Sequence, residues 1–74
     1  MSVARFKLYH RGPPMDMQAN IKHLESFPGV TLVAIYPLRD AVEVDVENFA
    51  FFIYWVMPRV KWFGVLLKTI ADPT

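Results

Sequence analysis

The sequence predicts an α+β fold, in which a four-stranded, mostly antiparallel sheet carries two helices on one face. Residues 3–10 and 41–47 alternate apolar with polar side chains, which is typical of half-buried strands. Residues 15–26 repeat apolar side chains at helical spacing, and residues 49–57 form an unbroken apolar run. With 74 residues, 54% of them hydrophobic and none a cysteine, the chain is expected to form a single α+β domain over residues 1–74.

The first strand and the first helix follow from side-chain spacing and from two prolines. Every second side chain of residues 3–10 is apolar, so one face of this strand is expected to be buried. Pro13 and Pro14 end the strand, because proline cannot donate to a sheet, and their fixed φ suits the first turn of a helix. The predicted helix buries side chains spaced three or four residues apart: Met17, Ile21 and Leu24.

Two strands are expected after the turn at residues 27–29. Residues 30–37 are apolar on both faces, which predicts a strand that is covered on each side. Residues 38–40 turn the chain. Residues 41–47 then place valines inward and acidic side chains outward, in the clearest alternation of the sequence.

The apolar run over residues 49–57 decides the order of the last elements. As a helix it would be apolar on all sides, and its Phe, Ile, Tyr, Trp and Val residues are those favoured in sheets. We therefore expect a strand here, with Pro58 opening a final helix that buries Val60, Phe63, Leu67 and Ile70. The preferred order is β-α-β-β-β-α.

The alternative is the ferredoxin-like order β-α-β-β-α-β, with residues 49–57 helical and residues 60–69 as the last strand. It would set Arg5 and Lys7 opposite acidic side chains of the third strand. The segment LESFPGVTLVAI also resembles the helix-to-strand junction of small metal-carrying modules of that fold. Those modules bind metal through a cysteine pair, which this chain lacks, so the resemblance implies no function.

In the preferred order, three strands end at one edge of the sheet, and both helices begin there. Helix N-termini and arginines stabilise anions, so this edge is the expected ligand-binding site, for a small anionic ligand or for an acidic group of a protein partner. Its residues are Tyr9, His10, Arg11, Arg39 and Arg59. The alternative is that these are solvated loop charges, with Arg39 and Arg11 balanced by neighbouring aspartates.

The expected function is therefore a small homo-oligomeric binding or regulatory module. The alternative is a minimal enzyme of the isomerase or lyase type, with a pocket between subunits in which His10 is the candidate catalytic base. No motif for catalysis, metal binding or a cofactor is present, so we expect neither metal nor cofactor.

The predicted oligomer, a dimer or larger, is expected to form through the outer face of the fourth strand. Phe52, Tyr54 and Val56 would lie exposed there, as a patch that a second copy covers. Nucleic acid is not an expected partner, because the formal charge is only +1 and acidic side chains would flank these aromatics. The apolar run is too short for a membrane span, and without a signal peptide the protein is expected in the cytoplasm.

Overall fold

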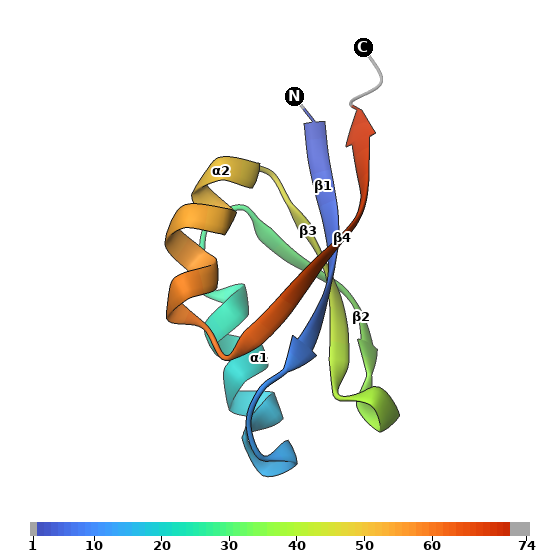
Figure 1. Cartoon of the computed structure of the whole chain (residues 1–74), viewed down its shortest axis with the longest axis vertical. Coiled ribbons are helices and arrows are strands. Elements are labelled where there is room, and N and C mark those ends of the chain that lie inside the picture. The colour runs from blue at the N-terminus through green and yellow to red at the C-terminus, as the bar shows by residue number, and fades with distance from the viewer. Residues whose placement is uncertain (1, 72–74) are drawn as a thin grey trace.

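The computed structural model describes residues 2–71, which form a four-stranded antiparallel sheet with helices on one face (Figure 1). The strands are β1 (Ser2–His10), β2 (Val30–Tyr36), β3 (Ala41–Val46) and β4 (Trp62–Ala71). The helix α1 (Met17–Glu25) follows a 3-10 turn, η1 (Pro14–Asp16), and a second 3-10 turn, η2 (Pro37–Arg39), joins β2 to β3. The helix α2 (Phe49–Phe51) continues directly into the π-helical turn η3 (Phe52–Val56) and the 3-10 turn η4 (Met57–Arg59).

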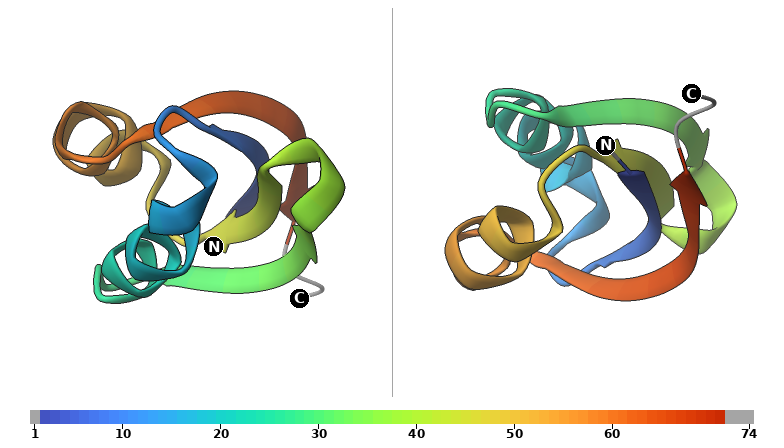
Figure 2. Two further views of the ribbon diagram at one scale, coloured as in Figure 1. Left: turned by 90° about the horizontal axis from the view of Figure 1, so that it is seen from below. Right: turned by 90° about the horizontal axis from the view of Figure 1, so that it is seen from above.

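The strands lie in the order β2-β3-β1-β4, so β1 is an inner strand between β3 and β4. Seen along the long axis, the sheet is strongly twisted, with the helices on one side of it (Figure 2). The α+β class, the antiparallel sheet and the two helices predicted from the sequence are confirmed. No helix within residues 2–71 is long and apolar enough to cross a membrane.

The preferred order of the last two elements is wrong, and the ferredoxin-like order is the one observed. Residues 49–59, here called the second helical segment, are helical, and Pro58 lies near the end of this segment. The predicted final helix is instead β4, which pairs with β1 along its whole length. Long-range pairing decides this region: β1 pairs with β3 along one edge, and residues 62–71 pair with its other edge.

The second helical segment tolerates its apolar composition because its two sides have different surroundings. Asn48 caps its start, since the Asn48 Oδ1 atom accepts a hydrogen bond from the backbone N–H of Phe51 at 3.0 Å. Phe52 and Val56 are completely buried against the sheet, whereas Tyr54 is 80% exposed. A helix that is apolar on all sides was expected to be excluded at the surface, but here the side with Tyr54 faces water.

The core lies between the helices and one face of the sheet. It contains the inward side chains of β1 and β3, with Leu8, Val42 and Val44 fully buried. Gly64 of β4 lies close to two side chains: an added Cβ would lie 3.1 Å from the Cε atom of Met57 in η4 and 3.3 Å from the Cδ2 atom of Leu8 in the neighbouring strand β1. A larger residue here would require Met57 or Leu8 to shift by a few tenths of an ångström, so the glycine serves close packing and not a special backbone conformation.

The opposite face of the sheet carries no helix and is called the open face (Figure 1). The register sets Arg5 opposite Asp45 and Lys7 opposite Glu43, as the ferredoxin-like order predicted. Arg5 binds Asp45 through two hydrogen bonds, Nε to Oδ1 at 2.7 Å and Nη2 to Oδ2 at 3.0 Å. These bonds lower the pKa of Asp45 and raise that of Arg5.

Candidate functional site

The end of β1, the turn before β3 and the start of β4 meet at one edge of the sheet. The backbone N–H of His10 donates to the carbonyl of Asp40 at 2.7 Å, and that of Arg11 donates to the carbonyl of Lys61 at 2.9 Å. These bonds bring together the segments that carry the residues expected at the ligand-binding edge. Their side chains, however, divide into separate groups.

A basic pocket lies at this edge, with a volume of about 330 Å³. It is lined by Arg11, Pro58, Arg59, Val60 and Lys61. The lining therefore holds three cationic side chains and no acidic one. Such a pocket has a positive potential that favours an anion. Lys61 was not among the expected residues, because its position depends on β4 beginning at Trp62, where a helix was predicted.

Aromatic rings hold both arginines of the basic pocket. The Arg11 Cζ atom lies 4.4 Å from the centre of the Phe63 ring, and the Arg59 Cζ atom lies 3.8 Å from the centre of the Trp55 ring. Arg59 also donates from Nη1 to the carbonyl of Trp55 at 2.8 Å. A guanidinium has five N–H donors, so stacking of this kind orients the group while most donors stay free for a ligand.

The contribution of the helices to this edge differs from the prediction. The chain enters α1 here, but the second helical segment ends here, so the expectation that both helices begin at this edge is wrong. A helix C-terminus presents carbonyl groups, which attract cations, and Arg59 donates to one of them. The basic side chains, and not a pair of helix dipoles, are what favour an anion at this edge.

Arg39 is not brought together with Arg11 and Arg59. It lies in η2 and lines a different depression, together with Ile35, Tyr36, Pro37 and Leu38. The sheet order explains the separation, since β2 is the outer strand on the side opposite β4. Tyr9 lies on the open face and is 38% exposed.

His10 points into the molecule, away from the basic pocket. Its ring packs on Trp62 with the centres 5.0 Å apart, and its Nε2 atom lies 2.7 Å from the Nδ2 atom of Asn20 in α1. The Nδ1 atom is buried. The observed contacts therefore join His10 to the packing between β1, β4 and α1, and not to the arginines that were expected to act with it.

The three residues predicted to form an oligomer interface do not share a surface. All three lie in the second helical segment and not on the open face. Phe52 and Val56 are completely buried in the core of the single chain, and Tyr54 alone is exposed. Their predicted placement is wrong because residues 49–59 are helical and do not form the predicted fourth strand.

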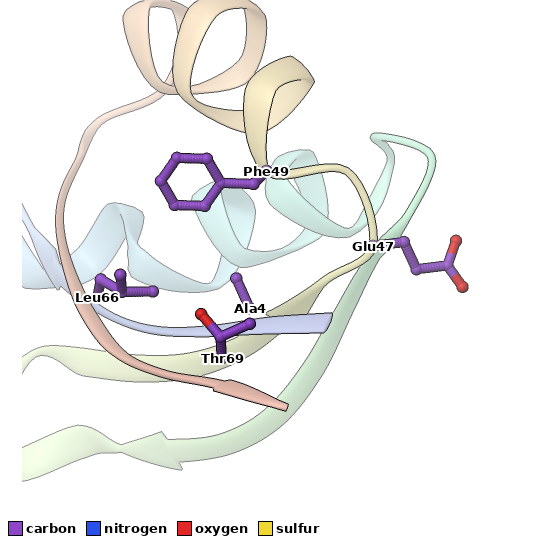
Figure 3. A pocket seen from close by; sticks show the side chains of 5 residues that line it. All are labelled: Ala4, Glu47, Phe49, Leu66 and Thr69. Atoms are coloured by element: carbon purple, nitrogen blue, oxygen red, sulfur yellow. The ribbon is translucent and has the colours of Figure 1, made fainter. Parts of the chain in front are cut away.

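A second, apolar pocket of about 360 Å³ lies where β1 and β4 extend beyond the helices (Figures 1 and 3). Phe49 lines the side of the pocket that faces the helices, and Ala4, Leu66 and Thr69 line the side formed by the sheet (Figure 3). Glu47 also lines it, but its carboxylate points away from the other side chains (Figure 3). This end of the sheet thus leaves apolar surface open along β4.

Comparison with known protein families, with curated proteins and with solved structures found no match to this chain. The arrangement of its own residues is therefore the basis for a function.

Proposed function

We propose that this protein is a small binding module whose basic pocket holds an anionic group, such as a phosphate or carboxylate of a ligand or of a partner protein. One observation carries the proposal: Arg11, Arg59 and Lys61 line a single pocket to which no acidic residue among residues 2–71 contributes. Hydrogen bonds from guanidinium or ammonium groups to anions are short and about twice as strong as neutral ones.

The pocket is open to water, so the expected affinity is modest. Two or three such contacts, offset by desolvation and by ordering of the side chains, are consistent with a Kd on the order of 1 mM for a free inorganic anion. A larger ligand with further contacts would bind more tightly. Since the attraction is electrostatic and exposed, added salt should weaken it.

The test is a titration with inorganic phosphate, followed through the backbone amide signals. The signals of Arg11 and of residues 59–61 are expected to move, and the Arg11→Ala and Lys61→Ala variants should each bind several-fold more weakly. Arg39→Ala is the matched control, because it removes an arginine from the same edge but from a different depression. If Arg39→Ala weakens binding as much as Arg11→Ala, or if no signal in the pocket moves, the proposal is wrong.

We also propose that the module associates with a second copy of itself through β4. This strand is an outer strand of ten residues, and residues 62–67 carry no charge. Val65, Leu66 and Leu67 are each between 45% and 49% exposed. An uncharged outer strand offers unpaired backbone groups to another strand, and two identical β4 strands can pair antiparallel about a two-fold axis without like charges opposed in residues 62–67.

Light scattering at micromolar concentration tests this association. The protein should be a dimer, and Val65→Lys should make it a monomer, because a charge would then lie in the paired edge. Val33→Lys is the matched control: Val33 is a 41% exposed valine of β2, the outer strand on the other side of the sheet. A monomeric parent protein, or a dimer that only Val33→Lys disrupts, would contradict pairing through β4.

A further inference from the structure

The open face carries a row of aromatic side chains that crosses all four strands. In the register of the sheet, Tyr36 lies opposite Ala41, Ala41 opposite Tyr9, and Tyr9 opposite Phe63. The three aromatic side chains are 37%, 38% and 60% exposed in the order Tyr36, Tyr9, Phe63. Ala41, which lies between Tyr36 and Tyr9 in this row, is completely buried. We call Tyr36, Tyr9 and Phe63 the aromatic row.

Cations lie against every ring of the aromatic row. The Lys7 Nζ atom is 5.1 Å from the centre of the Tyr36 ring and 5.6 Å from that of Tyr9. Arg11 lies over Phe63 and also lines the basic pocket. The row and the pocket are therefore joined through Arg11 into one continuous surface of rings and positive charge.

Two acidic side chains of the open face, Asp45 and Glu43, lie opposite cations in the register of the sheet. Asp45 forms its two hydrogen bonds with Arg5. Glu43 lies opposite Lys7 in the register, and burial together with the nearby Glu43 carboxylate raises the pKa of Tyr36. On the inner strands the cations Arg5 and Lys7 lie opposite the carboxylates Asp45 and Glu43, and Arg11 adds a cation over Phe63. Of these two carboxylates only Glu43 lies beside a ring of the row, Tyr36, and the Lys7 Nζ atom lies over the same ring.

We propose that the aromatic row binds single-stranded nucleic acid, with bases stacked on its rings and a backbone phosphate in the basic pocket. Neighbouring strands are about 4.8 Å apart, so Tyr9 and Phe63 stand side by side as a stacking surface. Aromatic rings interleaved with cations are the usual means by which sheets bind unpaired bases, and every base has a face that can stack. The phosphate contact rests on the proposed function of the basic pocket, whereas the stacking does not.

The low net charge limits how much electrostatic attraction can contribute to this binding. With a formal charge of +1, the protein cannot neutralise many phosphates. Stacking must then supply much of the affinity, and the dependence on salt should be shallow. Duplex DNA, whose bases are already stacked on each other, should bind more weakly than a single strand.

The experiment compares two fluorescent oligomers of the same length, about 12 nucleotides, by anisotropy: oligothymidylate and an abasic oligomer with the same phosphates but no bases. Oligothymidylate is expected to bind at least about tenfold more tightly, since stacked bases account for the difference. Tyr9→Leu removes a ring that does not touch the basic pocket, so it should weaken oligothymidylate binding about fivefold or more while leaving the abasic oligomer unchanged. Phe63→Leu removes a ring of the row that also holds Arg11, so it should weaken both oligomers, and oligothymidylate by the larger factor. Tyr54→Leu is the matched control, because Tyr54 is an exposed aromatic outside the row.

Equal binding of the two oligomers, or unchanged binding by Phe63→Leu, would overturn the proposal. If phosphate still moves the signals of Arg11 and Lys61 in that case, the basic pocket stands and only the aromatic row fails as a binding surface. If phosphate and both oligomers all fail to bind, both proposals are wrong. A circular dichroism spectrum equal to that of the parent protein shows that each variant is folded.

Discussion

The two faces of the sheet differ in what their side chains do. Along β1, Ala4, Phe6 and Leu8 are at most 4% exposed and pack against the helices. The residues between them, Arg5 and Lys7, point to the open face, where they contact a carboxylate and two tyrosine rings. A strand with a side-chain period of two can therefore stabilise the fold with one face and leave the other for recognition. Substitutions on the two faces should have very different effects.

The largest effect is expected on the covered face, at Phe52. Phe52→Ala removes a completely buried ring that packs 4.9 Å from the centre of the Phe6 ring. Truncating a buried phenylalanine costs about 3–5 kcal/mol. That is a large part of the stability of a small domain, which is about 5–15 kcal/mol. Urea denaturation should show a protein that is largely unfolded or far less stable.

Tyr54→Ala provides the comparison within the same helical segment. Tyr54 is 80% exposed, so its truncation should change the free energy of unfolding by about 0.5 kcal/mol or less. Equal losses from Phe52→Ala and Tyr54→Ala would contradict the observed orientation of residues 49–59, and would favour the extended form that the sequence first suggested.

A smaller effect is expected at Gly64, which lies close to Met57 of the helical layer and to Leu8 of β1. Gly64→Val places methyl groups against Met57 and Leu8, whose nearest atoms lie only 3.1 and 3.3 Å from the position that a Cβ would take. Overpacking of this kind costs about 1–3 kcal/mol. Gly64→Ala should cost less than Gly64→Val, because the flexible Met57 side chain can move. If Gly64→Val is as stable as the parent in thermal unfolding, the close approach of helix and sheet is not as described.

The smallest effect is expected on the open face, in the pH dependence of stability. Arg5 lowers the pKa of Asp45 in the folded protein. The pair therefore stabilises the fold at any pH above the pKa of an unfolded aspartate, which is about 3.9. This stabilisation is lost as the pH falls through the lower pKa that Asp45 has in the folded protein. Asp45→Asn should therefore be less stable than the parent at pH 7. The difference should narrow below about pH 4, as the parent's carboxylate becomes protonated. A difference that stays constant from pH 7 to about pH 2 would show that the ion pair does not cause it.

The sequence was informative where the pattern of a segment reflects that segment's own surroundings. Alternation in residues 3–10 and 41–47, and the spacing of Met17, Ile21 and Leu24, predicted the strands and α1 as they are observed. These segments each have one apolar side, so their burial can be read from local spacing.

The last part of the chain could not be assigned in this way. Residues 49–57 are apolar on every side, so their spacing does not distinguish a helix from a strand. Their residue types favour a strand, but local preference is weaker than the pairing that β4 makes with β1. Asn48 before the run was an available signal for a helix start, because its side chain is a good N-terminal cap.

Only part of the candidate site could be predicted, because its composition also depends on how distant strands pair. Arg11 and Arg59 were expected at one edge and do line one pocket, because both flank element ends. Lys61 was missed and Arg39 was included, since the sheet order determines which ends are neighbours. The aromatic row could not be seen in the sequence at all, because Tyr36, Tyr9 and Phe63 come together only through the register of the strands.

The pairing of β1 with β4 determines when, during synthesis, the aromatic row and the basic pocket form. Ser2 lies opposite Ala71 and His10 opposite Trp62, so β1 must wait for its second neighbour until almost the whole described chain has left the ribosome. Closing so long a loop is entropically costly, and such distant contacts slow folding. Phe63 and Lys61 join Tyr9 and Arg11 only in this last step. Neither the ring surface nor the basic pocket exists on a nascent chain that lacks β4, and both appear together once β4 has paired with β1.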